Sequence, residues 1–335
     1  MNSKVAFIDH YYHTKTKSGD FLREILFSNF KIDNYWIKSD LKFNKNIFNY
    51  KNLFFFQILP NFSTLKKLKN KNIIWVPMYD SPHYPYGYSW ILWKMIEYLD
   101  IKVVSFSKKI SHQIKKKNIN INCISLKFFK KNKYQKINNK INIFFWNRGD
   151  IKIKDWINSV DLKFINKIYY LNLDQIYPES IDKSIKDKFL IIKRKFLDQK
   201  IFLKLLSKCE IFVSPRKKEG IGMAQVEALS MGQYLLAFND STMNDYILNK
   251  KIGFFFSKNK NDIINIKNII NFKKYRLDFN RKNYLKYETR KKLILKLYAK
   301  KTKFKFNFFF ELLVLIFYIY KILKRSFITI PFPRK

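Results

Sequence analysis

The succession of short apolar segments constrains the fold more than any other feature of this sequence. In the N-terminal half these segments are short and mostly apolar, and they lie at 5–9, 53–58, 73–76, 103–106 and 123–126. Between them, apolar residues recur with helical spacing at 21–27, 89–99 and 107–116. Short strands that alternate with helices are typical of a parallel sheet covered by helices on both faces. We therefore expect an α/β fold with a doubly wound sheet.

The same pattern begins again after the lysine-rich segment 127–140, which we interpret as a linker. The second series of strand-like segments lies at 141–146, 168–171, 189–192, 211–214 and 235–238. Helices are expected at 202–207 and after Gly222. The sequence thus predicts an N-terminal domain at 1–130, a similarly built domain at 140–275 and a basic helical tail at 276–335. Since ligands of such sheets bind beyond the carboxyl ends of the strands, we expect the site in a cleft between the domains.

The tail contains a long apolar segment, FNFFFELLVLIFYIYKIL, at 306–323. Its length is close to that of a membrane span, but Glu311 and Lys321 interrupt it. Three interpretations are compatible with this pattern: a helix lying on an anionic membrane surface, a membrane span, or a helix that packs back onto the first domain.

The formal net charge of +42 favours an anionic partner, such as nucleic acid or an acidic membrane. Codon bias is the alternative explanation, because lysine, isoleucine, asparagine, phenylalanine and tyrosine all have A/T-rich codons and all are abundant here. A nucleic-acid-binding surface would interleave exposed aromatic and basic residues, whereas the aromatic residues here fall in predicted buried strands. We expect no nucleic-acid partner.

The two cysteines, Cys123 and Cys209, are far apart and show neither disulfide nor zinc-site spacing, which favours a reducing compartment. Cys209 lies in an apolar run and is expected to be a buried free thiol. The first residues run straight into a strand-like segment with no secretory signal, so a cytoplasmic protein is expected.

The segment EGIGMAQVEALSMG, residues 219–232, follows the predicted strand at 211–214. Gly220 and Gly222 allow a sharp turn, and the residues after them can form a helix. The N-terminus of a helix offers unpaired N–H groups and a positive dipole end, where phosphate or a sugar hydroxyl can bind. Glu219 precedes this helix and Glu227 lies about two turns further on, so the two carboxylates can hold different parts of one ligand.

This segment resembles the signature of retaining glycosyltransferases of the GT-B fold, particularly glycosyltransferase family 4. The matching residues are Ser214-Pro215, Glu219-Gly220-Ile221-Gly222, Glu227-Ala228 and Met231-Gly232. The resemblance implies two Rossmann-like domains. It also implies that Glu219 binds hydroxyls of a donor sugar, that Glu227 binds the ribose, and that the backbone of 220–223, which includes Met223, lies near the sugar and phosphates. The chain departs from the family at 239–242, where Asn-Asp-Ser-Thr stands in place of a frequent Gly-Gly turn.

A second match is Arg148, which follows the predicted strand at 141–146. In the family an arginine there, with a lysine about five residues later, neutralises the donor diphosphate; Lys152 and Lys154 are the candidates for that lysine. A diphosphate leaving group needs cationic hydrogen-bond donors, and no Asp-x-Asp metal motif is apparent in a strand context. We expect no metal and no cofactor apart from the nucleoside diphosphate sugar as co-substrate. The alternative for Arg148 is an ordinary basic turn.

The acceptor-side candidates lie in the N-terminal half. The family places a glycine-containing loop after the first strand, and here that loop carries His10, His13, Lys17 and Ser18. Lys17 and Ser18, at a helix start, can bind phosphate, and each histidine is either catalytic or structural. The loop after 73–76 carries Asp80 and His83, which are candidates to bind an acceptor hydroxyl; a turn stabilised by Asp80 is the alternative.

The sequence therefore predicts a retaining, metal-independent glycosyltransferase that moves a sugar to a hydroxyl of a glycan or lipid-linked acceptor. The leaving phosphate acts as the base in this family, so no enzymic nucleophile is required. The basic surface and the apolar tail suit lipopolysaccharide or capsule synthesis at the inner face of the cytoplasmic membrane. The alternatives are a GT-B epimerase or phosphorylase, or a non-enzymatic protein that binds nucleic acid or membrane.

Overall fold

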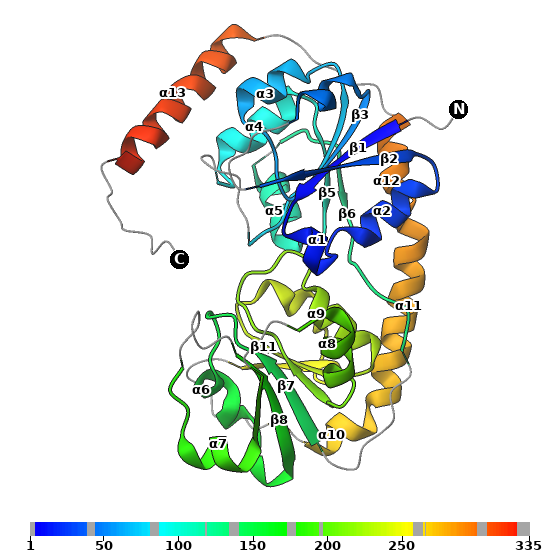
Figure 1. Ribbon diagram of the computed structural model, residues 1–335, viewed down its shortest axis with the longest axis vertical. Coiled ribbons are helices and arrows are strands. Elements are labelled where there is room, and N and C mark those ends of the chain that lie inside the picture. The colour runs from blue at the N-terminus through cyan, green and yellow to red at the C-terminus, as the bar shows by residue number, and fades with distance from the viewer. Residues whose placement is uncertain are drawn as a thin grey trace. The chain divides into compact units, whose positions relative to one another are not determined.

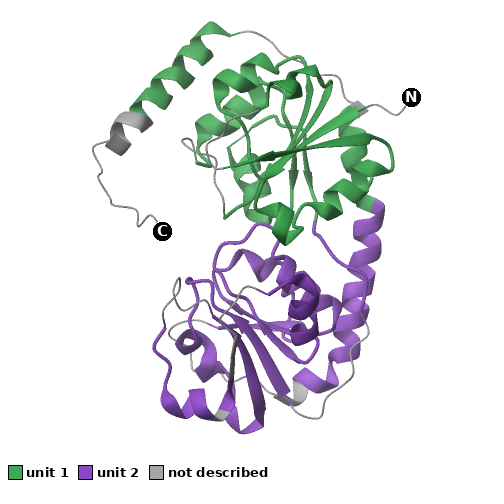
Figure 2. Cartoon of the chain, viewed as in Figure 1, with its two compact units in different colours: residues 1–126, 290–335 green, residues 127–289 purple. Residues whose placement is uncertain are grey.

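The computed structural model describes residues 4–38, 44–80, 87–117, 119–133, 141–172, 179–193, 197–256, 264, 266–299 and 307–326. The chain forms two compact units (Figure 2). Unit 1 comprises 1–126 and 290–335, and unit 2 comprises 127–289. The predicted tail at 276–335 is thus shared between the two units.

Unit 1 is built on a six-stranded parallel sheet in the order β2-β1-β3-β4-β5-β6. The strands are β1 (Lys4–His10), β2 (Lys31–Ile37), β3 (Asn52–Phe56), β4 (Asn72–Val76), β5 (Lys102–Ser105) and β6 (Cys123–Ser125). The five strands predicted for this half are confirmed. The unpredicted strand is β2, which lies at the edge of the sheet, mixes polar and apolar residues and is partly exposed.

Helices cover both faces of this sheet (Figure 1). On one face lie α3 (Phe62–Lys67), α4 (Trp90–Tyr98) and α5 (Lys108–Lys116), and on the other lie α2 (Asp20–Phe27) and α12 (Leu293–Ala299). The short α1 (His13–Thr16) follows β1. As its composition predicts, α4 is buried on most sides, and Leu92, Trp93, Met95 and Ile96 have no exposed surface.

Unit 2 repeats this architecture with the strand order β12-β11-β10-β7-β8-β9. The strands are β7 (Ile141–Trp146), β8 (Ile165–Leu171), β9 (Leu190–Lys193), β10 (Ile211–Val213), β11 (Tyr234–Phe238) and β12 (Gly253–Phe256). The helices are α6 (Ile153–Trp156), α7 (Lys183–Phe189), α8 (Gln199–Leu206), α9 (Met223–Ser230), α10 (Ile266–Asn271) and α11 (Lys273–Lys291), the last of which runs on past the unit boundary. Cys209 is a buried free thiol, as predicted, and burial raises the pKa of that thiol.

Each sheet has one point at which successive strands begin to add on the opposite side. In unit 1 this switch point lies between β1 and β3, and in unit 2 it lies between β7 and β10. Ligands of doubly wound sheets bind at this point, beyond the carboxyl ends of the strands. The loops that leave β1, β7 and β10 carry most of the candidate residues, so the topology itself places them where ligands bind.

The last described helix, α13 (Phe308–Ser326), packs on unit 1 along one side only. Val314 is buried there, and Glu311 accepts a hydrogen bond of 2.8 Å from the Tyr98 hydroxyl and pairs with Lys66. The opposite side exposes apolar side chains, namely Phe308, Phe309, Leu312, Leu313, Leu315, Ile316, Ile319 and Tyr320. None of the helices in the described part of the chain is long and apolar enough to cross a membrane.

Candidate active site

The turn that starts α9 requires glycine at position 222. Gly222 caps the helix with φ 67° and ψ 53°, a left-handed conformation that L side chains rarely adopt. A Cβ atom there would lie 2.0 Å from the Met243 sulfur. Gly220 and Ile221 are buried beside it, and Met223, the first residue of α9, is half-buried. The glycine-dependent turn and the helix predicted from the sequence are confirmed.

The segment after β11 holds the loop that carries Glu219. The Glu219 backbone N–H donates to the Thr242 hydroxyl at 2.7 Å, and the Thr242 N–H donates to the Lys217 carbonyl at 2.9 Å. The Ser241 hydroxyl donates to the Arg216 carbonyl at 3.0 Å. Ser241 and Thr242 belong to the segment 239–242, at which the sequence departs from the family pattern, and their hydroxyl groups fix the backbone of the Glu219 loop.

A buried glutamine fixes the position of α9 as well. Gln225 is 1% exposed, accepts a hydrogen bond from the Ser214 hydroxyl and donates to the Met243 carbonyl at 3.0 Å. It therefore ties α9 to the end of β10 and to the segment that clamps Glu219. This role was not predicted from the sequence, where Gln225 appears as one more helical residue.

Glu227 is 4% exposed and lies in the middle of α9. Its carboxylate pairs with the ammonium groups of Lys130 and Lys133, the latter at 2.7 Å. The Lys133 N–H also donates to the Ser230 carbonyl at 3.0 Å, so the described part of the predicted linker lies against α9. A carboxylate has about four acceptor positions, so two lysines leave capacity for hydroxyl groups. That Glu227 binds a ribose stays a prediction.

Arg148 lies just beyond the carboxyl end of β7, on a turn that the side chain of Asn147 holds by hydrogen bonds. Its guanidinium lies over the Trp146 ring, 4.6 Å from the centroid. The buried Asn147 donates to the Tyr170 hydroxyl at 3.0 Å, and its side-chain oxygen accepts a bond of 2.9 Å from the Gly149 N–H. These bonds hold the backbone so that Arg148 projects from a rigid turn.

One ion pair joins the loops that leave β7 and β10. The Asp150 carboxylate lies 3.5 Å from the Arg216 guanidinium. Asp150 is two residues after Arg148, and Arg216 is three residues before Glu219. The structure thus brings the two predicted motifs together at the switch point. Lys152 is half-buried at the N-cap of α6, whereas Lys154 is exposed within that helix. Which of the two lysines contacts the donor diphosphate stays a prediction.

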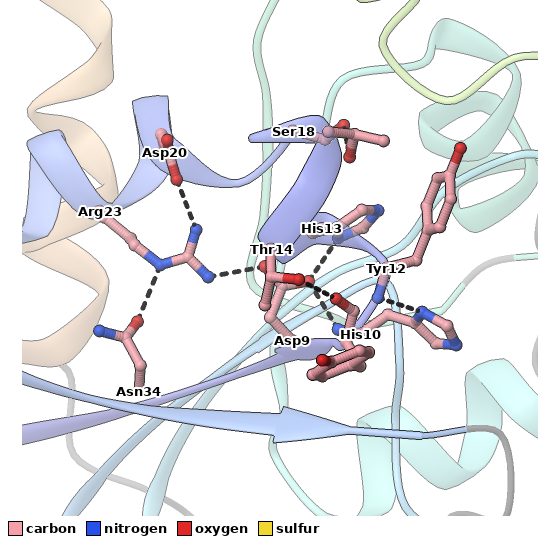
Figure 3. A network of polar contacts seen from close by, with 11 residues as sticks. Asp9, His10, Tyr12, His13, Thr14, Ser18, Asp20, Arg23 and Asn34 are labelled. Atoms are coloured by element: carbon pink, nitrogen blue, oxygen red, sulfur yellow. Dashed lines mark hydrogen bonds and ion pairs between the residues drawn. The ribbon is translucent and has the colours of Figure 1, made fainter. Parts of the chain in front are cut away.

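A polar cluster around the buried Asp9 lies at the carboxyl end of β1 in unit 1 (Figure 3). Asp9 is fully buried and accepts hydrogen bonds from the His10 backbone N–H at 2.7 Å, from His13 Nδ1 at 2.5 Å and from Arg23 Nη2 at 2.7 Å. Arg23 also pairs with Asp20 at 3.0 Å. Asp9 and Arg23 were not predicted as site residues, although an aspartate at the end of an apolar strand is a recognisable signal.

The remaining acceptor-side candidates have different surroundings. Lys17 is exposed and ends α1 in a left-handed conformation, with φ 57°. The Ser18 hydroxyl shares a hydrogen bond of 2.9 Å with Thr16. Asp80 is half-buried after β4, and His83 lies outside the described residues. Within the described ranges, no group of three or more histidine, cysteine, aspartate or glutamate residues is arranged to hold a metal ion.

A protein-family model matches part of the chain. The model of the family "Glycosyl transferases group 1" matches residues 175–292, which include β10, the Glu219 loop and α9. No curated protein sequence matches the chain significantly.

Solved structures share the fold at low sequence identity. TarM from S. aureus, in complex with UDP, has a TM-score of 0.53 and 17% identity, covering 75% of this chain and 56% of its own. Sucrose-phosphate synthase from Thermosynechococcus elongatus has a TM-score of 0.60 and 9% identity, covering 89% and 98%. WaaG, a glycosyltransferase involved in lipopolysaccharide biosynthesis, has a TM-score of 0.53 and 11% identity, covering 88% and 98%. The chain spans little more than half of the TarM chain it matches.

The chain therefore has the GT-B fold, with two doubly wound α/β domains and a C-terminal helical segment. The resemblance to GT-B glycosyltransferases of group 1, drawn from the residues around Glu219, is confirmed.

Proposed function

We propose that this protein is a retaining, metal-independent glycosyltransferase that moves a sugar from a nucleoside diphosphate sugar to a hydroxyl of a glycan or lipid-linked acceptor. The observation that carries this proposal is the arrangement at the switch point of unit 2. There the glycine-initiated helix α9, the Glu219 loop and the Arg148 turn begin from adjacent parallel strands. The presence of UDP in the similar TarM structure supports a nucleotide-linked donor.

We assign each part of this arrangement a role, the cationic and helix-end groups from their chemistry and the two glutamates from the resemblance to the family. The first N–H groups of α9 have no partner within the helix, and its positive end favours the donor phosphates. Arg148 and Lys152 supply cationic donors that stabilise the diphosphate as it leaves, and such groups contribute most where charge develops. Glu219 binds hydroxyls of the donor sugar and Glu227 binds the ribose. The acceptor hydroxyl attacks from the face that the diphosphate leaves, and the leaving phosphate takes its proton.

We further propose that the acceptor lies at the inner face of the cytoplasmic membrane. The exposed side of α13 carries apolar residues, among which Phe309 is 82% exposed and Ile316 is 56% exposed. Lys324 and Arg325 follow them in a chain whose net charge is +42, which suits an anionic lipid surface. Lipopolysaccharide or capsule synthesis fits such a location, and the similarity to WaaG supports it.

The proposal is tested with UDP-, GDP- and ADP-sugars, by thermal stabilisation of the chain and by slow hydrolysis of the donor. We expect one nucleotide series to stabilise the protein and to be hydrolysed. Arg148→Ala should lower turnover about 100-fold or more, because it removes a charge-stabilising donor. Lys218→Ala, an exposed lysine of the Glu219 loop, is the matched control and should behave like wild type. Binding of no donor, or conversion of the donor to its epimer, would contradict the proposal.

A further inference from the structure

The chain has four histidines, and two of them lie at the carboxyl end of β1: His10 is its last residue and His13 begins α1. This is the switch point of unit 1, where ligands of a doubly wound sheet bind. The His13 ring also packs against Phe56, the last residue of β3, with ring centroids 5.2 Å apart. The His13 ring is thus in contact with both strands that define the switch point, through Asp9 of β1 and Phe56 of β3.

Asp9 determines which nitrogen of His13 carries a proton. A carboxylate only accepts hydrogen bonds, so His13 Nδ1, at 2.5 Å from Asp9, must be the donor. In the neutral ring the other nitrogen, Nε2, is then an acceptor. Figure 3 shows the ring extending from Asp9 with Nε2 on its far side, and none of the described residues forms a hydrogen bond to that nitrogen.

His10 has the opposite arrangement. Its Nδ1 accepts a hydrogen bond of 3.1 Å from the Tyr12 backbone N–H, so the proton of the neutral ring is on Nε2. Burial and the neighbouring His13 lower the pKa of His10, which favours that neutral form near pH 7. The ring centroids of the two histidines are 6.3 Å apart. The pair therefore presents one acceptor nitrogen and one donor nitrogen, and a sugar hydroxyl can satisfy either.

Asp9, which positions His13, is itself held by Arg23. Arg23, the second partner of Asp9, also donates to Asn34 at 2.8 Å and lies over the Phe7 and Trp36 rings. Gly19 leaves room for this contact, because a Cβ there would be 2.7 Å from the Asp9 carboxylate and 2.9 Å from Arg23. Asp9 is thus held from the side opposite His13, and its position fixes the imidazole.

We propose that His13 and His10 form a sugar-hydroxyl subsite, in which His13 Nε2 accepts from and His10 Nε2 donates to hydroxyls of a sugar substrate. Asp9 and Arg23 are the positioning residues. The subsite rests on the proposed function, which supplies a sugar as ligand. The hydroxyl belongs to the acceptor or to the donor sugar, and the kinetic test distinguishes the two.

The first experiment reads the tautomers directly and does not need activity. In ¹⁵N-labelled protein, the ring nitrogens of His13 and His10 should report opposite neutral tautomers. Asp9→Asn should change the His13 signals and leave those of His112, an exposed histidine on α5, unaltered. If both rings show the same tautomer, or if Asp9→Asn leaves His13 unaffected, the subsite is wrong.

The second experiment measures KM in two arms, with His13→Leu, His13→Gln and the control His112→Gln. One arm is hydrolysis of UDP-, GDP- or ADP-glucose, and the other is transfer to methyl glucoside or methyl galactoside. We expect His13→Leu to raise KM about tenfold in one arm with little change in kcat, and the glutamine variant to recover part of the loss. Equal KM values for all three variants would overturn the subsite, whereas an inactive wild type would contradict the proposed function alone.

Discussion

Replacing Gly222 with alanine tests the turn on which the donor helix depends. At φ 67° an alanine is in a left-handed backbone conformation, which lowers the free energy of unfolding by about 1–2 kcal/mol. Its Cβ would also lie 2.0 Å from the Met243 sulfur, so that the buried Met243 must move, which adds about 1–3 kcal/mol. We therefore expect Gly222→Ala to lower the free energy of unfolding of unit 2 by roughly 2–5 kcal/mol.

Gly87 provides the matched control for this substitution. It has a similar φ of 58°, but no atom lies within 4 Å of the position its Cβ would take. Gly87→Ala should therefore cost only the backbone term, about 1–2 kcal/mol. The difference between the two variants measures the contact with Met243.

The assay is urea unfolding of the full chain, followed by hydrogen exchange on peptides from each unit. The double variant Gly222→Ala/Met243→Ala should be more stable than the sum of the single losses predicts, by about 1 kcal/mol or more, because removal of the Met243 side chain relieves the contact. Equal losses for the two glycine variants, or strict additivity of the double variant, would refute the reasoning.

Three further predictions use the same structure. Thr242→Val should weaken donor binding about tenfold in a titration, because a partly buried backbone N–H of the Glu219 loop loses its acceptor; unchanged affinity would show that this hydrogen bond does not position the loop for the donor. Phe309→Ser/Ile316→Ser should prevent flotation with anionic liposomes, whereas Leu285→Ser, an exposed leucine of α11, should not. The pKa of His10 is lowered in the fold, so its contribution to stability is present above its unfolded value and declines as pH falls. Thermal unfolding between pH 7 and 5 should therefore depend less on pH in His10→Gln, and identical profiles would count against the neutral form.

The sequence predicts the strands that are buried on both faces, because these are continuous apolar runs. It does not predict β2, whose sequence KIDNYWI shows neither a continuous apolar run nor a regular alternation, and it does not predict β12 (GFFF). The short helix α3 is also missed, because its sequence FSTLKK has only two apolar positions.

The candidate site was predictable where its chemistry is local. Glu219, Gly222 and Glu227 lie within nine residues, and Arg148 directly follows a strand. Contacts between distant positions were not predictable: Arg23 is 14 residues from Asp9, Thr242 is 23 from Glu219, and Lys130 is 97 from Glu227. Among 67 lysines and arginines, no pattern distinguishes Lys130 or Lys133 from a solvated lysine.

The central claim is that the Glu219 loop and α9 bind a nucleoside diphosphate sugar. Isothermal titration of wild type and Glu219→Gln with the nucleoside diphosphate sugar, and with the same nucleoside diphosphate lacking the sugar, tests it most directly. Wild type should bind the sugar-bearing nucleotide more tightly, and Glu219→Gln should lose about tenfold in affinity for that ligand while binding the sugar-free nucleotide as wild type does. If wild type binds neither ligand, or if the variant weakens both equally, the assignment of Glu219 to the donor sugar is contradicted.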